Sequence, residues 1–125
     1  MRILVVEDDC DIGVLVQYNL RADGFEVLLA GDGPPALCEL QKGGIDLLVL
    51  DLMLPTMSGL EVCKAVRSDP VLRQIPILIM TARGEDAVRM LAFQMGASDY
   101  LVKPFHTHEL LERVRSLMPQ PARKI

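Results

Sequence analysis

The sequence predicts a single α/β domain built around a parallel β-sheet. Five short apolar segments of strand length alternate along the 125 residues with five segments whose apolar residues recur at helical spacing. The chain is 50% hydrophobic and long enough to bury a substantial core. Right-handed crossovers between the strands would bring all five carboxyl ends to one edge of the sheet.

The first half of the chain shows this alternation twice. We expect strands at residues 2–6 and 25–29, each followed by a helix, and Asp9 or Asp11 can cap the first helix. Glycines at 24 and 43–44 end the two helices. The expected apolar positions are Ile12, Leu15, Val16 and Leu20 in the first helix, Phe25, Val27 and Leu29 in the second strand, and Leu37 and Leu40 in the second helix.

The second half predicts strands at residues 47–50, 77–80 and 100–102, again with a helix after each. Residues 47–50 are apolar without a break, which is typical of a strand buried on both faces. The expected apolar helix positions are Leu60, Cys63 and Val66, then Val88, Leu91, Ala92 and Met95, and finally Leu110, Val114 and Leu117. We expect the domain to span residues 1–118, and residues 119–125 have the composition of a tail or the start of a linker.

Composition and charge argue against several classes of protein. The net charge is −4 and the basic residues are scattered, so we expect no nucleic-acid binding by this domain itself. The sequence shows no signal peptide and no segment of transmembrane length, and we expect a cytoplasmic protein without membrane contact. Cys10, Cys38 and Cys63 lack metal-ligand spacing and are interpreted as reduced thiols that pack in the fold.

Polar side chains follow four of the five predicted strands. They are Glu7, Asp8 and Asp9 after the first strand, Asp51 after the third, Thr81 after the fourth and Lys103 after the fifth. Carboxylates gathered at one edge of a sheet would repel one another unless a cation lay among them. Oxygen ligands without His or Cys favour a hard divalent ion, Mg²⁺ before Ca²⁺.

The same residues suit a phosphoryl group. Asp51 would be the nucleophile and form an acyl phosphate, while Lys103 neutralises phosphoryl oxygens and Thr81 donates a hydrogen bond. Each residue also has an ordinary structural interpretation, as a turn residue for Asp51, a helix cap for Thr81 and a surface lysine for Lys103. Together, however, the strand ends supply a metal site, a nucleophile, a hydroxyl and a cation, and this combination favours a phosphoryl-binding site.

Four motifs make the sequence resemble the response-regulator receiver domain of two-component signalling. They are Val-Val-Glu-Asp-Asp at 5–9, Asp-Leu-Met-Leu-Pro-Thr-Met-Ser-Gly at 51–59, Met-Thr-Ala at 80–82 and Asp-Tyr-Leu-Val-Lys-Pro-Phe at 99–105. The resemblance covers about residues 2–118, and within the family the sequence is most similar to receivers of winged-helix transcription factors. It implies a flavodoxin-like, doubly wound (βα)5 fold with strand order 2-1-3-4-5 and helices on both faces.

The resemblance implies roles for the acidic motifs. Asp51 would be the phosphoacceptor. Asp8 and, partly through water, Glu7 would join Asp51 in binding Mg²⁺. The backbone carbonyl of Met53 would be a further metal ligand.

By the same resemblance, Thr81 and Lys103 would contact the phosphoryl group. Tyr100 matches the aromatic residue that swings inward when Thr81 moves toward the phosphate. The Lys103–Pro104 bond matches a cis peptide of the family. The signal would be read out on the face built from residues 86–118.

The resemblance also implies partners. A sensor histidine kinase, a phosphotransfer protein or a small phosphodonor would supply the phosphate, and a downstream output domain or protein would receive the signal. The 86–118 face carries charges that match those used for homodimerisation in the winged-helix subfamily, although Gln94 and Ser98 stand where that subfamily more often has acids. These charges are Arg89, Asp99, Glu109 and Arg113.

Two other classes fit less well. A haloacid-dehalogenase-like phosphohydrolase would carry a second Asp two residues after the nucleophile, where this chain has Met53. A flavodoxin-type flavin module would need a Ser/Thr-rich phosphate loop where this chain has three acids at 7–9. We therefore expect no enzyme activity beyond the domain's own phosphorylation and dephosphorylation. A stand-alone receiver acting by protein contacts and the receiver half of a DNA-binding regulator both remain open.

Overall fold

The computed structural model describes residues 1–118, so the predicted tail at 119–125 lies outside the described residues. Five parallel strands form one sheet in the order β2-β1-β3-β4-β5, which confirms the predicted fold and strand order. The strands are β1 Arg2–Val6, β2 Glu26–Ala30, β3 Leu47–Leu50, β4 Ile77–Thr81 and β5 Asp99–Val102.

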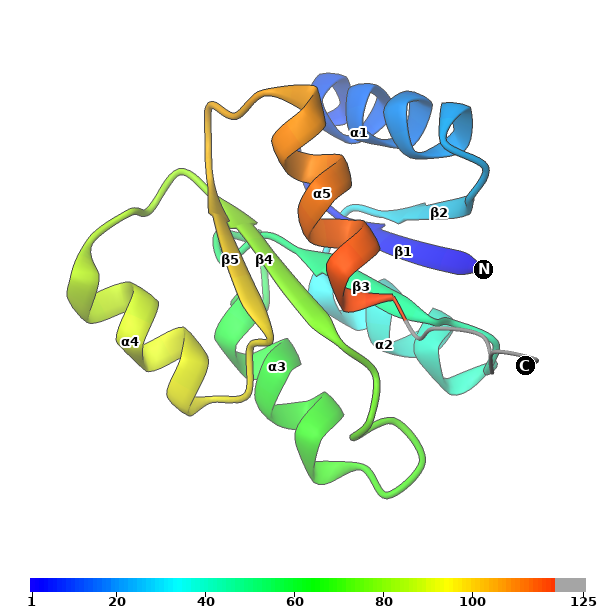
Figure 1. Cartoon of the computed structure of the whole chain (residues 1–125). Coiled ribbons are helices and arrows are strands. Elements are labelled where there is room, and N and C mark those ends of the chain that lie inside the picture. The colour runs from blue at the N-terminus through cyan, green and yellow to red at the C-terminus, as the bar shows by residue number, and fades with distance from the viewer. Residues whose placement is uncertain (119–125) are drawn as a thin grey trace, which may run out of the picture.

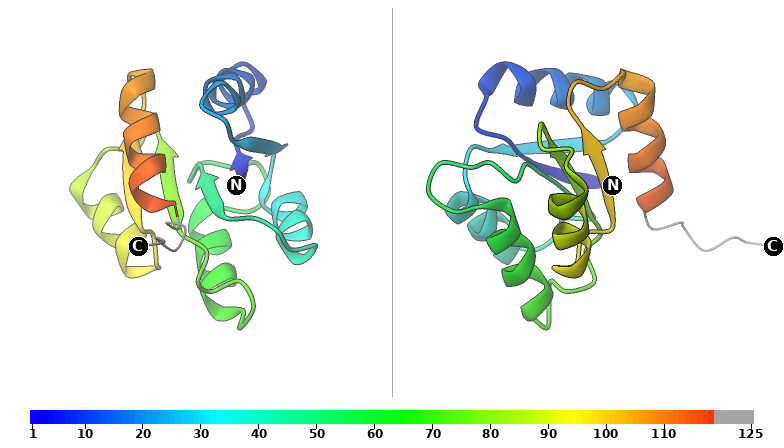
Figure 2. Two further views of the ribbon diagram at one scale, coloured as in Figure 1. Left: turned by 45° about the vertical axis from the view of Figure 1, so that its right-hand side comes forward. Right: turned by 90° about the vertical axis from the view of Figure 1, so that its left-hand side faces the viewer.

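Helices cover both faces of the sheet. Their bounds are α1 Cys10–Ala22, α2 Gly33–Gln41, α3 Gly59–Ser68, α4 Asp86–Gln94 and α5 Thr107–Leu117. Helices α1 and α5 pack on one face, whereas α2, α3 and α4 pack on the other (Figures 1 and 2). None of the helices in residues 1–118 has both the length and the apolar composition that a membrane span requires.

The two faces have separate apolar cores because side chains alternate along each strand. In β1, Ile3 and Val5 pack toward α1 and α5, whereas Leu4 and Val6 pack toward the other three helices. All four residues of β3 are fully buried, as expected for a central strand covered on both sides.

The register of the sheet brings the ends of its strands level. Val6 pairs with Leu50, and the next residue of each strand continues the ladder, with the Asp51 amide donating to the Val6 carbonyl at 3.0 Å. At the other side of the sheet, the Lys103 amide donates to the Thr81 carbonyl at 2.8 Å. The residues that follow the strands therefore face one shared edge.

Several sequence-based predictions of burial are wrong. Leu15 of α1 is 59% exposed and Leu91 of α4 is 43% exposed, although both were expected on apolar faces. Leu29 at the end of edge strand β2 is also exposed, although Val27 on the same face of that strand is buried. Cys10 and Cys38 lie on the surface, so the packing interpretation holds for Cys63 alone among the three thiols.

Candidate functional site

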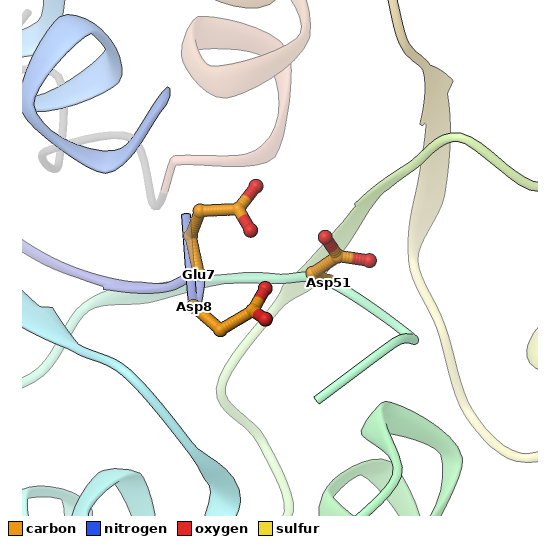
Figure 3. A group of neighbouring side chains, drawn as sticks. All are labelled: Glu7, Asp8 and Asp51. Carbon is orange, nitrogen blue, oxygen red and sulfur yellow. The ribbon is translucent and has the colours of Figure 1, made fainter. Parts of the chain in front are cut away.

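Three carboxylates gather at the carboxyl edge of the sheet. Glu7 and Asp8 follow β1, Asp51 follows β3, and one oxygen from each lies within 4.8 Å of the others (Figure 3). Glu7 is 6% exposed and Asp51 is 4% exposed, whereas Asp8 is open to solvent. Two nearly buried carboxylates this close together need a cation to offset their repulsion and their loss of hydration.

Lys103 supplies one such cation. It stands just after β5, and its ammonium donates to the carboxylate of Glu7 and, at 2.7 Å, to Oδ2 of Asp51. The backbone amide of Met53 donates to the other oxygen, Oδ1 of Asp51, at 3.0 Å. Asp51 is thus held through both oxygens, and the Lys103–Pro104 bond beside it is cis, as predicted.

The charged groups of the site shift one another's pKa. Burial raises the pKa of Glu7, and the hydrogen bond from Lys103 offsets part of that rise. Burial lowers the pKa of Lys103, but the carboxylates of Asp51 and Glu7 outweigh it, so that its pKa is raised overall. Lys103 therefore stays protonated at neutral pH. One ammonium among three carboxylate groups leaves the cluster acidic, and its all-oxygen donor set suits a hard divalent cation such as Mg²⁺.

An open cleft of about 770 Å³ lies over these residues. The three carboxylates, Met53, Ala82 and Lys103 are part of its lining. Thr81 is not, because it is the fully buried last residue of β4, where its hydroxyl accepts from the Arg83 amide at 3.4 Å. The structure thus brings five of the six predicted site residues to one cleft and places the sixth directly before Ala82 in its wall.

Two features that support the Asp51 loop escaped the sequence analysis. Asp32, the N-cap of α2, accepts from the hydroxyl of Thr56 at 2.5 Å and from its amide at 3.3 Å, which pins the loop after β3 to a neighbouring helix. A side chain at Gly59 would bring its Cβ within 2.3 Å of the Asp51 carbonyl oxygen, so only glycine lets α3 begin here. Gly59 stood in a quoted motif, but the Asp32–Thr56 contact has no local sequence signal.

Tyr100 of β5 points inward. It is 3% exposed, and its hydroxyl donates to the backbone carbonyl of Arg83 in the loop between β4 and α4. The guanidinium of Arg89 lies over the ring, 5.2 Å from its centroid, and the ring of Phe93 lies 6.3 Å away. The structure shows Tyr100 in the inward position, and the predicted movement of Tyr100 with Thr81 stays a prediction.

Three of the four charges proposed for dimerisation, Asp99, Glu109 and Arg113, pair within the chain. Arg113 donates to Asp99 at 2.9 Å and lies 3.8 Å from Glu109 one helical turn away. The homodimer through the 86–118 face therefore stays a prediction. His106 and His108 are exposed at the start of α5.

The fold and the cleft define a doubly wound α/β domain with an acidic, lysine-containing site at the carboxyl edge of its sheet. A family model for the response regulator receiver domain matches residues 3–115. The chain belongs to this family. The motif resemblance of the sequence is thereby confirmed.

The comparisons with individual proteins agree. The phosphate regulon transcriptional regulatory protein PhoB of Rhizobium meliloti is 46% identical over 117 residues, which cover 94% of this chain and 52% of that protein. The chain thus spans about half the length of this curated relative.

Two solved structures are similar over nearly their whole length. The chemotaxis protein CheY4 of Vibrio cholerae is 33% identical with a TM-score of 0.89, covering 94% of this chain and 98% of that one. The receiver domain of a sensor histidine kinase from Pseudomonas aeruginosa is 30% identical with a TM-score of 0.86, covering 93% and 95%. That structure has a magnesium ion coordinated in the active site cleft.

Proposed function

We propose that this receiver domain is a signalling switch that accepts a phosphoryl group on Asp51. The observation that carries the proposal is the environment of this carboxylate, which is nearly buried at the end of β3, bonded to Lys103 at 2.7 Å and open to the acidic cleft. A buried carboxylate that fixes a cation beside it is poised to react with an electrophilic phosphorus atom.

Glu7, Asp8, Asp51 and the backbone carbonyl of Met53 would hold Mg²⁺, with Glu7 acting partly through water. The fit rests on the cluster of three carboxylates within 4.8 Å and on the magnesium in the similar receiver domain. When bound, the ion supplies positive charge that neutralises phosphoryl oxygens and orients them.

In the transfer step, an oxygen of Asp51 forms a bond to the phosphorus of the donor. The bond from phosphorus to the donor's histidine nitrogen, or to the leaving group of a small phosphodonor, breaks with its electron pair staying on the donor. Lys103 then lies beside the new acyl phosphate and neutralises its charge, while Ala82 leaves room for the incoming group. Water attack on the phosphorus later returns the carboxylate and releases phosphate, so the domain's chemistry is confined to its own Asp51.

The response to phosphate would run through Thr81 and Tyr100. Thr81 would turn its hydroxyl toward a phosphoryl oxygen, and Tyr100 would occupy the inward position beside it. The added charge shifts an existing equilibrium between two conformations rather than creating a new one. The altered surface would be that of residues 86–118, where a homodimer or another partner could bind.

An apolar surface beside the cleft suits a protein phosphodonor. Ile12 and Leu15 of α1 form a hollow with Ala82, Lys103 and Phe105, and this hollow shares three of its residues with the lining of the cleft. Contiguous exposed apolar surface is a feature of many protein contact sites. We propose that the histidine kinase or phosphotransfer protein docks here.

A relative suggests which process the switch controls. The relative from Rhizobium meliloti is named a transcriptional regulatory protein. We propose that this domain also acts on transcription, through an output domain of the same chain or through a partner protein.

Intact-mass measurement after incubation with phosphoramidate tests the phosphoacceptor. We expect a phosphoryl adduct that needs Mg²⁺ and is absent from Asp51→Asn. A matched control is Asp46→Asn, because Asp46 precedes the same strand at its opposite end, where it accepts from the Arg2 amide at 2.8 Å. The control should form the adduct at the rate of the unaltered protein.

A protein that shows no adduct would next be titrated with beryllofluoride and Mg²⁺, a phosphoryl mimic that needs no turnover. A Mg²⁺-dependent spectral change that Asp51→Asn abolishes would support the site. Absence of both the adduct and this change would overturn the proposal, and so would an adduct that persists in Asp51→Asn.

A further inference from the structure

Helix α4 is weakly anchored compared with the other helices in the described part of the chain. Ala92 is its single buried residue, and its N-cap, Glu85, makes no side-chain capping bond. The apolar residues Met90, Leu91 and Phe93 are 62%, 43% and 42% exposed. A helix held this loosely can shift at small cost, so the few contacts that it does make decide where it sits.

Two of those contacts meet on one aromatic ring. Arg89 and Phe93 lie one turn apart on α4 and both face Tyr100, at 5.2 Å and 6.3 Å from the ring centroid. The same ring carries the hydroxyl that binds the Arg83 carbonyl, two residues after Thr81. Tyr100 therefore joins α4 to the loop that leaves the site.

We infer that Arg89 is a positioning residue that holds Tyr100 inward. Its guanidinium covers the face of the ring, where the negative charge of the π system attracts a cation. We expect Tyr100 to lose this contact when it turns outward. Arg89 thus links the position of α4 to the orientation of Tyr100. The consequence for signalling rests on the proposed function, in which the inward orientation belongs to the phosphorylated state.

The surrounding charges leave Arg89 free for this task. Arg83, the other cation near the ring, is engaged by both carboxylate oxygens of Glu85, at 3.1 Å and 3.0 Å. Within residues 1–118, no carboxylate forms an ion pair with Arg89. Since Arg89 is exposed, its contact with the ring should change the ratio of outward to inward Tyr100 by about two- to fivefold.

The test uses Tyr100 as its own reporter. The chain has two tyrosines and no tryptophan, and Tyr18 is exposed on α1, so Tyr18→Phe leaves Tyr100 as the one tyrosine signal. With ring-labelled tyrosine, saturation-transfer NMR measures the outward and inward populations without any phosphodonor. Arg89→Met keeps a flexible helix-forming side chain and removes the charge. Arg73→Met, at an exposed site before β4, is the matched control.

We expect Arg89→Met to raise the outward-to-inward ratio about two- to fivefold, Arg89→Lys to restore part of the difference, and Arg73→Met to leave the ratio unchanged. A double-mutant cycle in urea adds a second readout. Arg89→Met should lower the free energy of unfolding when Tyr100 is present and leave it unchanged in a Tyr100→Leu background. An unchanged ratio, or a ratio that changes equally in the control, overturns the inference even if the cycle shows coupling.

The two proposals can fail separately. The NMR comparison needs no phosphate, so an unchanged ratio in Arg89→Met removes the role of Arg89 and leaves phosphorylation of Asp51 standing. Conversely, a protein that takes up neither phosphate nor beryllofluoride fails the proposed function. In that case a changed ratio would still establish that Arg89 positions Tyr100.

Discussion

In β3, residues 47–50 are fully buried and apolar, whereas Asp51, the next residue, is almost as buried and carries a carboxylate. The strand interior packs against helices on both faces of the sheet and gains stability from apolar burial. The carboxylate at the strand end gains no stability in this way, because burying a charge costs free energy. Lys103 and the Met53 amide offset part of that cost.

The difference separates stability from function within one strand. Substitutions in the interior should change the free energy of unfolding and leave the chemistry of Asp51 intact. Substitutions at the end should abolish or alter the chemistry and change stability less. Function is concentrated where the fold bears a local cost, as is common for active sites.

The largest effect on stability is expected from Leu48→Ala. Leu48 is fully buried in the core beneath α2 and α3, so truncation removes apolar contacts and leaves a cavity. The free energy of unfolding should fall by about 2–5 kcal/mol, measured by urea denaturation. Leu28→Ala, on the exposed edge of β2, is the control and should cost far less. Loss of the Asp51 adduct in folded Leu48→Ala protein would contradict the separation.

The reactivity of the three cysteines compares the buried interior with the protein surface and needs no stability measurement. Burial raises the pKa of Cys63 to about 11, two units above the ordinary value of 9.0, so its thiolate is about a hundredfold scarcer at neutral pH. Iodoacetamide should therefore modify exposed Cys10 and Cys38 in the native protein, and Cys63 only after unfolding. Modification of Cys63 should speed up as the pH rises toward 11. Equal labelling of all three thiols in the native protein would show that the interior is open.

A smaller stability effect is expected from Lys103→Met. Removing the ammonium leaves the nearly buried carboxylates of Glu7 and Asp51 without a cation, and we expect a loss of about 1–3 kcal/mol in the free energy of unfolding. Added Mg²⁺ should restore part of that loss by taking over the charge compensation. Lys64→Met, an exposed lysine on α3, should show neither effect. A Lys103→Met protein as stable as its parent in the presence of a chelator would refute this account of the edge.

The sequence predicts the sheet well because strand signals and strand-end polarity are local. Each strand lies within one residue of its expected bounds, and β4 and β5 each include one residue more. Glu7, Asp8 and Asp51 could be grouped in advance because the carboxyl ends of parallel strands share an edge. The same reasoning brought Lys103 to that edge.

The burial of helix residues could be predicted less accurately than the strands. Periodicity identified the apolar face of α1 and α4 but not how far the sheet covers it, so Leu15 and Leu91 were wrongly placed in the core. The depth of Thr81 within β4 was missed for a related reason, since a β-branched residue suits both a strand end and a cap. Contacts between distant side chains, such as Asp32 with Thr56 or Arg89 with Tyr100, leave no local pattern to detect.

The central claim is that the carboxylate at the end of β3 receives the phosphate, and chemical mapping tests it most directly. Borohydride reduces an acyl phosphate to an alcohol, so phosphorylated protein treated in this way should carry homoserine in place of the modified aspartate. Peptide mass spectrometry should place that change at position 51 in Mg²⁺-treated samples and nowhere in Asp51→Asn. Homoserine at Asp8, Asp9 or Asp46 instead of Asp51 would contradict the account.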